Sequence, residues 1–344
     1  MRVSRSIPTA LALLGVLVSV TGALADTRVG GELRGDHEWT KAGSPYILTS
    51  DLTITKEGTL RIGPGVTVRA KANIADFTGF NKFDIDIIVN GVLEAHGAEG
   101  DSIYFTSDAD RPRWQDWQGI VIQKGGRADI SATHLEFANT AILVDEGDLH
   151  LEGSTIQFCE LYGVHFLKTG GVLDDVTITQ IGNTGGSGVG VWIDVGADPV
   201  IKNSFIVGAQ NGITCSRLAK GTVSYTVISL CTGNGLTIRN SNPVIHNTTV
   251  SGNEYGVVLS WDSMPTLNNN NFFNNGTADV FIRDYKKDVV KIDLSNNFWG
   301  TTDLAVIEDA VLDGVDNENV KAFAIVEPFL ESAVSTDAGA DAGR

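Results

Sequence analysis

The chain has 344 residues, of which 42% are hydrophobic, and this is enough for one large core or an elongated repeat array. Its formal net charge is −17. A surface this acidic repels phosphate backbones, so we do not expect nucleic acid as a partner. It also disfavours an acidic polysaccharide, unless cations or a local basic patch intervene.

Residues 1–25 have the features of a secretory signal peptide. Arg2 and Arg5 precede an apolar run from Ala10 to Val20, and Ala23-Leu24-Ala25 forms a small-x-small cleavage site. This run is too short to span a membrane comfortably, and no other stretch could span one. We therefore expect a protein that is secreted, periplasmic or at the cell surface, with no transmembrane segment after cleavage.

Residues 26–118 are predicted to form an N-terminal cap and the first coils of a repeat array. Apolar residues alternate in two short runs, Leu52–Ile54 and Leu60–Val68, as in short strands. Two loops interrupt the coils, and both carry aromatic side chains. They are Asp76–Asp84 and Ser107–Gln118.

Residues 119–300 carry a short phrase that recurs eight times: a small residue, then apolar, variable and apolar residues. It starts at Gly119, Ala141, Gly163, Gly190, Gly212, Gly235, Gly256 and Asp279, with steps of 22, 22, 27, 22, 23, 21 and 23 residues. Two further short strands follow each phrase. A period near this length, built from short alternating strands, indicates a β-solenoid whose stacked coils share one apolar core.

An asparagine recurs at one bend of the C-terminal coils, at Asn203, Asn247, Asn269 and Asn296. Asparagine tolerates the left-handed backbone conformation, and its amide can bond to a stacked neighbour. The pattern therefore predicts an asparagine ladder at this bend.

The array needs a cap at its C-terminal end, because an open sheet edge invites aggregation. Asp303 is placed to cap a helix from Leu304 to Leu312, and a strand is predicted from Val320 to Val326. We assign residues 301–330 to this cap. Residues 331–344 are small and polar, and we expect them to form a disordered tail.

Several motifs resemble the landmarks of secreted right-handed parallel β-helix repeat proteins: Val66-Thr-Val68, Ile87–Leu93, Ile103–Ser107, Trp117–Ile120 and Asn296–Gly300. The likeness covers about residues 30 to 330. It implies an all-β fold, a right-handed parallel β-helix of about ten coils with an N-terminal cap and a short helix-plus-strand cap. This superfold includes pectate lyases, polygalacturonases, alginate epimerases and many non-catalytic proteins, so it says little about activity.

The catalytic motifs of polygalacturonase-like hydrolases are missing, since the sequence has no Gly-His-Gly and no Arg-Ile-Lys. The Asp174-Asp175 pair falls at a bend, where a solvated turn is the better interpretation. The chain thus resembles a non-catalytic branch of the superfold.

No cofactor is expected, and the six histidines show no metal-ligand spacing. The acids Asp108, Asp110 and Asp116 leave calcium open without supporting it, because Arg111 and Arg113 compete for their carboxylates.

Strand alternation predicts which side chains face outward from the repeated phrase. One outward row is Val121, Leu143, His165, Trp192, Thr214, Thr237, Val258 and Phe281; beside it runs Gln123, Asp145, Leu167, Asp194, Ser216, Arg239, Ser260 and Arg283. Aromatic rings flanked by polar groups suit stacking on sugars, and apolar stripes suit protein docking. A simple preference of such residues for strands explains the pattern equally well.

Three hypotheses follow. The first is an exported non-catalytic scaffold that presents this stripe to a polysaccharide or a cell-surface protein. Its ligand-binding candidates are Leu143, His165, Trp192, Asp194, Arg239, Phe281 and Arg283. The second is a polysaccharide lyase or glycoside hydrolase with a divergent site, whose weak catalytic candidates are Asp145, His165, Asp194 and Arg239. In it Asp194 acts as acid or base and Arg239 binds a carboxylate. The third is a structural module of an extracellular assembly.

Overall fold

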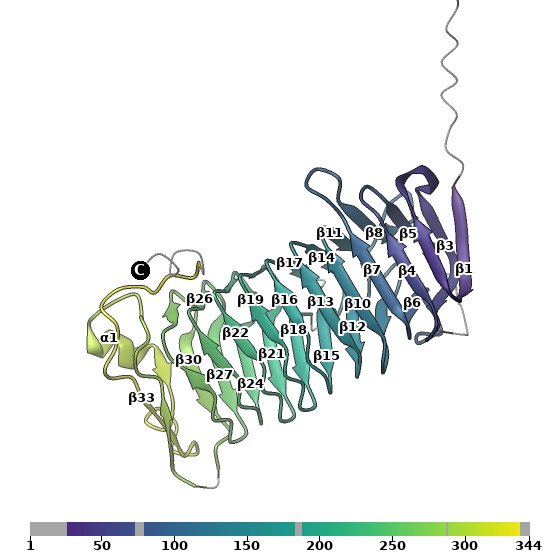
Figure 1. Cartoon of the computed structure of the whole chain (residues 1–344). Helices are drawn as coiled ribbons and strands as arrows, with labels where there is room; N and C mark the ends of the chain where they lie inside the picture. The colour runs from purple at the N-terminus through teal and green to yellow at the C-terminus, as the bar shows by residue number, and fades with distance from the viewer. Residues whose placement is uncertain (1–25, 73–78, 183–187, 287, 338–344) are drawn as a thin grey trace, which may run out of the picture.

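The computed structural model describes residues 26–72, 79–182, 188–286 and 288–337. The predicted signal peptide lies outside these residues. The described chain winds into a right-handed parallel β-helix, in which three stacks of short strands surround one apolar core (Figure 1). The expected fold class is confirmed.

The first stack is built from the strands of the repeated phrase and their N-terminal equivalents. It contains β6 (Asp86–Val89), β9 (Gly119–Ile122), β12 (Thr140–Asp145), β15 (Tyr162–Leu167), β18 (Val189–Asp194), β21 (Asn211–Ser216), β24 (Asn234–Arg239), β27 (Tyr255–Ser260), β30 (Ala278–Arg283) and β32 (Val311–Leu312).

The second stack has ten strands in one sheet, which agrees with about ten coils. It contains β2 (Asp36–Trp39), β4 (Thr59–Ile62), β7 (Val92–His96), β10 (Arg127–Ser131), β13 (Asp148–Glu152), β16 (Val172–Asp174), β19 (Val200–Lys202), β22 (Thr222–Ser224), β25 (Val244–His246) and β28 (Thr266–Leu267).

The third stack closes each coil. It contains β5 (Thr67–Ala70), β8 (Ile103–Ser107), β11 (Thr133–Glu136), β14 (Thr155–Cys159), β17 (Thr177–Ile181), β20 (Phe205–Val207), β23 (Val227–Ser229), β26 (Thr249–Ser251) and β29 (Asn271–Phe273). At the N-terminal end β1 (Thr27–Leu33) pairs with β3 (Tyr46–Ile54), which joins the first and third stacks by pairing with both β5 and β6. A short 3-10 helix, η1 (Lys41–Gly43), precedes β3.

The core forms because equivalent positions of successive coils stack in strict register. In the first stack Ile142 pairs with Val164, Val164 with Val191, and Val191 with Ile213, and all four side chains are buried. One coil cannot bury its own inner face, but each coil covers the next.

The bend predicted to hold asparagine does adopt the left-handed conformation, with φ of 53° at Asn203 and 58° at Asn269. The same conformation occurs in earlier coils at Ala132 (47°) and Tyr225 (49°). The repeat geometry therefore imposes the bend whatever the side chain, and among residues with a side chain asparagine tolerates it at low cost.

The best-developed ladder lies one residue further along the chain than predicted. The N–H of Thr248 donates to Oδ1 of Asn270 at 3.1 Å, and the N–H of Asn270 donates to Oδ1 of Asn297 at 2.9 Å. These side chains are fully buried. They point inward, where the N–H groups of the bend need partners that water cannot supply.

The C-terminal cap contains the expected helix and strand. Asp303 caps α1 (Leu304–Asp309) by accepting from the N–H of Ala305. The helix is shorter than predicted, because residues 311–312 form β32 and pair with β30. The strand β33 (Ala322–Ile325) pairs with β31 (Val290–Asp293).

Residues 331–337, which begin the expected disordered tail, are described and carry no helix or strand. Val334 exchanges two hydrogen bonds of 2.9 and 3.0 Å with the side chain of Asn271. In the described residues no helix is long and apolar enough to cross a membrane.

Candidate functional site

The outward stripe lies on the first stack, in the register that the sequence alternation predicts. Leu143 pairs with His165, His165 with Trp192, and Trp192 with Thr214. The adjacent polar row is in register as well, since Asp194 pairs with Ser216 and Ser216 with Arg239.

The stripe is not evenly exposed. Val121 is 1% exposed, Leu143 6% and Val258 2%, so these three outward side chains are buried. Val121 lies in register between the larger side chains of Ile88 and Leu143, which cover it. The accessible surface is therefore divided into separate hollows.

An aromatic cluster occupies the middle of the stripe. The rings of His165 and Trp192 are stacked, with centroids 4.7 Å apart and an interplanar angle of 11°. The ring of Tyr162 packs against both, at 5.2 Å from His165 and 4.9 Å from Trp192. All three side chains are half-buried.

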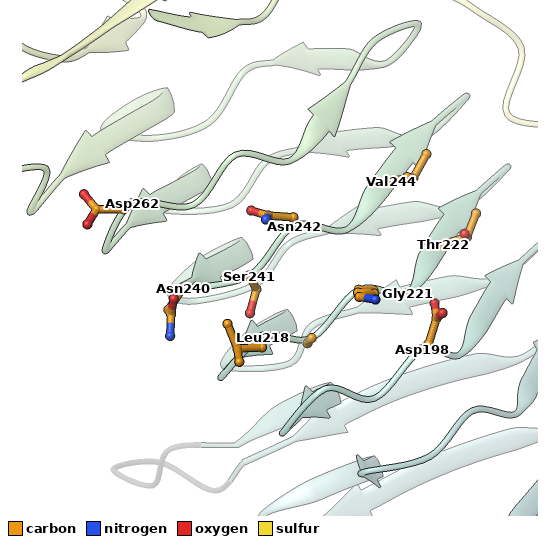
Figure 2. A pocket seen from close by; sticks show the side chains of 11 residues that line it. Asp198, Leu218, Gly221, Thr222, Asn240, Ser241, Asn242, Val244 and Asp262 are labelled. Atoms are coloured by element: carbon orange, nitrogen blue, oxygen red, sulfur yellow. The ribbon is translucent and has the colours of Figure 1, made fainter. Parts of the chain in front are cut away.

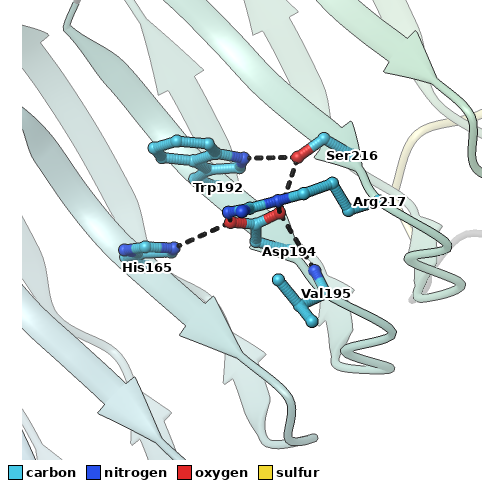
Figure 3. Close-up of polar contacts among 6 residues, drawn as sticks. All are labelled: His165, Trp192, Asp194, Val195, Ser216 and Arg217. Carbon is cyan, nitrogen blue, oxygen red and sulfur yellow. Dashed lines mark hydrogen bonds and ion pairs between the residues drawn. The ribbon is translucent and has the colours of Figure 1, made fainter.

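Asp194 is the anchor of this cluster (Figure 3). Its carboxylate is fully buried. It accepts two hydrogen bonds from the guanidinium of Arg217, one of them at 2.7 Å, and one of 2.7 Å from the hydroxyl of Ser216. That same hydroxyl accepts from Nε1 of Trp192 at 2.9 Å. The network thereby fixes the plane of the Trp192 ring.

These contacts set the protonation states. Burial alone would raise the pKa of Asp194, but hydrogen bonds from Arg217 and Ser216 outweigh it and hold the pKa below its usual value. Burial lowers the pKa of His165, although the Asp194 carboxylate opposes this effect. Nε2 of His165 lies 3.7 Å from Asp194, which is too long for a hydrogen bond, and this buried nitrogen has no hydrogen-bond partner. His165 is therefore neutral at pH 7.

A groove of about 440 Å³ opens on the C-terminal side of Trp192. Trp192 and Arg217 line one end, and Arg239 and Trp261 line the other. The guanidinium of Arg239 lies 4.4 Å from the centroid of the Trp261 ring, and Trp261 is 53% exposed. Two indole rings thus flank a polar floor in one open groove, which we call the tryptophan groove.

A second hollow of about 510 Å³ lies on the N-terminal side of His165. Leu143, Asp145 and His165 line its floor, and Phe80 and Phe83 form a wall. Oδ1 of Asp145 is buried in the structure without a hydrogen-bond partner. We call this space the histidine hollow.

A third depression of about 550 Å³ lies over the bends that connect the first and second stacks (Figure 2). Asp198, Leu218 and Asp262 contribute to its lining. It shares Asn240 with the tryptophan groove, so the accessible surface continues around this edge of the helix.

The C-terminal candidates form a separate pair of contacts. Phe281 stacks on Tyr255, with centroids 5.4 Å apart, and the guanidinium of Arg283 lies 5.8 Å from the Phe281 ring. Arg283 also lies 3.8 Å from Asp284. Neither Phe281 nor Arg283 lines the tryptophan groove.

The structure gives Asp194 a partner that the sequence analysis did not name. Arg217 neutralises Asp194, while Arg239 stacks on Trp261. Since Asp194 is buried and accepts hydrogen bonds from Arg217, Ser216 and the N–H of Val195, its geometry does not fit the role of a catalytic acid or base.

Sequence reasoning missed Arg217, Trp261 and Tyr162. Arg217 and Trp261 follow the strand ends, at bends with φ of 54° and 59°. Tyr162 directly precedes the small residue of the repeated phrase, and its ring packs on the rings of His165 and Trp192. Columns of the residues one place before and two places after each phrase contain all three.

The loop that contains Asp108, Asp110 and Asp116 was considered as a calcium site, and the contacts of Asp116 do not favour it. Asp116 is buried, and its carboxylate accepts from the hydroxyl of Ser107 at 2.6 Å and from the N–H of Arg113 at 2.9 Å. Across residues 26–72, 79–182, 188–286 and 288–337, no group of three or more acidic, histidine or cysteine side chains could hold a metal ion.

The family follows from the match of residues 118–298 to the right handed beta helix region. The chain belongs to the right-handed β-helix family. Residues 32–155 also match a pectate-lyase like beta helix domain. No curated protein matches the chain in sequence.

Solved structures of this family share the fold at low sequence identity. An aspartate-to-alanine mutant of the periplasmic alginate epimerase AlgG is 14% identical with a TM-score of 0.55, covering 88% of this chain and 77% of that one. A threonine-to-asparagine mutant of the same epimerase is 14% identical with a TM-score of 0.50, covering 83% of this chain and 78% of that one. These likenesses show the fold.

Proposed function

We propose that this protein is an exported β-helix scaffold that binds an acidic glycan in the tryptophan groove. The observation that carries the proposal is the pairing of two accessible indole rings, Trp192 and Trp261, with an arginine between them in one groove. The parallel strands supply a rigid platform, since each contributing side chain sits on or directly beside a strand of the first stack.

Sugar rings suit this groove because they have apolar faces and polar edges. An indole ring offers a large flat surface at little entropic cost, while fixed polar groups orient the ligand. Trp192 is held in place by Ser216 and Asp194, so its plane is set before a ligand arrives. Pre-organisation of this kind reduces the entropy lost on binding.

The charge of the groove favours a carboxylated glycan over a neutral one. Arg239 has no acidic partner within ion-pair distance among the described residues, and it lies beside Trp261. Arg217 presents the exposed part of its guanidinium to the same groove. Arg217 is neutralised by Asp194, so Arg239 supplies the local positive charge that an acidic polysaccharide requires, and Arg217 adds hydrogen-bond donors.

A protein partner fits this surface less well. Its accessible parts are separate hollows, since the aliphatic members of the stripe are buried. A protein interface needs a continuous patch with a dry centre, whereas a chain of sugars can occupy successive hollows.

A second function is favoured by one specific observation. His165 is neutral, and its imidazole ring lines the histidine hollow. A neutral imidazole in this position could accept a proton from a bound sugar, as a polysaccharide-active enzyme requires. The alginate epimerase activity of the two structural neighbours makes a uronate polymer the first substrate to test.

We also propose that the mature protein resides outside the cytoplasm, in the periplasm, in the medium or at the cell surface. The support is the composition of residues 1–25, with two arginines, an apolar run and a small-residue cleavage site.

The binding proposal is tested by titrating the mature protein with oligosaccharides of alginate, of polygalacturonate and of a neutral glucan. We expect the uronate oligosaccharides to bind and the neutral one to bind at least tenfold more weakly. Trp261→Ala and Arg239→Gln should each weaken uronate binding about tenfold or more. The first variant loses the stacking of a sugar ring on the indole, and the second loses a charged hydrogen bond to the carboxylate.

Two matched controls lie away from the groove. Phe205→Ala removes an exposed aromatic ring from the third stack, and Lys56→Gln removes an exposed positive charge from the N-terminal coils. Binding that survives both groove variants would rule out the tryptophan groove as the site. Release of unsaturated ends or a change in uronate composition, abolished by His165→Gln, would favour the enzyme.

A further inference from the structure

Buried carboxyl groups lie beneath residues 79–84, the segment that forms the wall of the histidine hollow. Asp86, at the start of β6, is fully buried. Asp51 of β3 and Asp84 are buried as well, at 5% and 8% exposure. This concentration of acids in an apolar setting is costly unless protons or hydrogen bonds compensate.

Asp86 holds the segment directly. Its Oδ2 accepts from the N–H of Phe80 and, at 2.9 Å, from the N–H of Asn81. The N–H of Asp86 in turn donates to Oδ1 of Asp51 at 2.9 Å. The path of residues 80 and 81 therefore depends on the state of the Asp86 carboxyl group.

The carboxyl groups of Asp51 and Asp86 face the same small space. A Cβ atom at Gly79 would overlap carboxylate oxygens of both residues, so only glycine fits between them and the segment. Oδ1 of Asp86 is buried without a hydrogen-bond partner. The charged groups that act on Asp86 are the acids Asp51, from β3, and Asp84, from the segment.

Burial raises the pKa of Asp86 to about 7. Hydrogen bonds from the N–H groups of Asn81 and Phe80 oppose this shift, and the charges of Asp51 and Asp84 add to it. Because Asp51 and Asp86 interact closely, they titrate as a pair.

A proton suits this space better than a metal ion does. The N–H groups of Phe80 and Asn81 point at Oδ2 of Asp86, and a cation at this oxygen would face their positive ends. One proton shared by the pair removes a negative charge. It also allows Oδ1 of Asp86, which has no hydrogen-bond partner, to carry the proton.

We propose that Asp51 and Asp86 form a proton switch that sets the position of residues 79–84. With one proton on the pair, the segment lies against the first stack. When that proton leaves, two negative charges face each other in a buried space, and water can reach Asp86 where Phe80 and Asn81 now lie. The segment then detaches, and the wall of the histidine hollow opens.

The test is amide hydrogen exchange of the mature protein without any glycan, corrected for the intrinsic effect of pH. Protection of residues 79–84 should fall about tenfold between pH 6 and pH 8, because docking of the segment weakens as the pH rises from the ordinary aspartate pKa to about 7 and levels off above it. Segments of the central coils should keep their protection. This measurement contains no glycan, so its outcome does not depend on whether the glycan titration of the proposed function succeeds.

Two variants test whether ionisation of Asp86 beside Asp51 causes the loss of protection. Asp86→Asn removes the titrating group, and its protection should be the same at pH 6 and pH 8. Asp51→Asn removes the like charge and lowers the pKa of Asp86, so the loss of protection between pH 6 and pH 8 should become smaller. Asp101→Asn is the control, because this carboxylate is exposed and paired with Lys41. Protection that does not vary with pH in the unmodified protein, or the same variation in Asp86→Asn, would overturn the switch.

Discussion

His165 and Trp192 stack face to face across two adjacent strands, with ring centroids 4.7 Å apart. The distance follows from the fold, since neighbouring strands of a sheet lie about 4.8 Å apart. Two rings at the same position of successive coils are therefore brought to stacking distance by the register alone. The cluster with Tyr162 separates the histidine hollow from the tryptophan groove.

The first prediction concerns the hydrogen bonds from Arg217 to Asp194. Arg217→Gln leaves a fully buried carboxylate with one charged partner fewer, and we expect a loss of roughly 1–3 kcal/mol in the free energy of unfolding. The double variant Arg217→Gln with Asp194→Asn should recover part of this loss, because no charge then remains buried. Denaturant unfolding of the three variants measures both effects. An unchanged midpoint for Arg217→Gln would show that the hydrogen bonds from Ser216 and the N–H of Val195 suffice.

The second prediction concerns the titration of His165. Its pKa lies below the ordinary value, with burial as the main cause, the Asp194 charge raising it and the Arg217 charge lowering it. Asp194→Asn should therefore lower the pKa further. Proton NMR of the imidazole across pH 4 to pH 8 measures the change.

The sign of the stability effect follows from the same shift. The unfolded chain binds a proton at His165 more readily than the folded chain does, so this residue costs stability as pH falls below about 6.5. His165→Gln should remove that part of the acid sensitivity. A His165 signal that titrates above its ordinary value would contradict the burial of the ring.

The third prediction tests the shared core. Phe166 is fully buried in the first stack, and Phe166→Ala should cost about 3–5 kcal/mol, because a cavity replaces a large side chain. Phe205→Ala on the exposed face of the third stack is the matched control and should cost less than about 1 kcal/mol. Thermal or denaturant unfolding followed by circular dichroism compares the two.

The fourth prediction concerns the inner ladder. Oδ1 of Asn270 accepts from the N–H of Thr248, and its Nδ2 donates to the carbonyl of Ile245 at 2.9 Å. Asn270→Ala leaves both backbone groups buried without a partner and should cost about 1–3 kcal/mol. Asn319→Ala, in an exposed part of the C-terminal cap, should have little effect. Equal losses in both variants would argue against a structural ladder.

The sequence alone predicted the solenoid and its inside–outside pattern because both depend on a short repeat. Strand alternation has a period of two, so the small residue of each phrase fixes which side chains face out. It placed Trp192 outward and beside His165 correctly. The φ angles of the bends followed for the same reason, since Asn203 and Asn269 occupy equivalent positions.

The partners of the outward side chains could not be predicted in the same way. Arg217 and Trp261 belong to bends, where one residue of difference in length changes the direction of a side chain. The sequence analysis therefore named no partner for Asp194, while in the structure Arg217 pairs with it. Likewise, the wall of the histidine hollow comes from Phe80 and Phe83, in a loop that a repeat pattern does not describe.

The central claim is that an acidic glycan occupies the tryptophan groove. The most direct measurement is a crystal structure of the mature protein with a uronate oligosaccharide. We predict sugar rings stacked on Trp192 and Trp261 with a carboxylate at Arg239. An oligosaccharide bound on the second or third stack, with the groove left open to solvent, would contradict the claim.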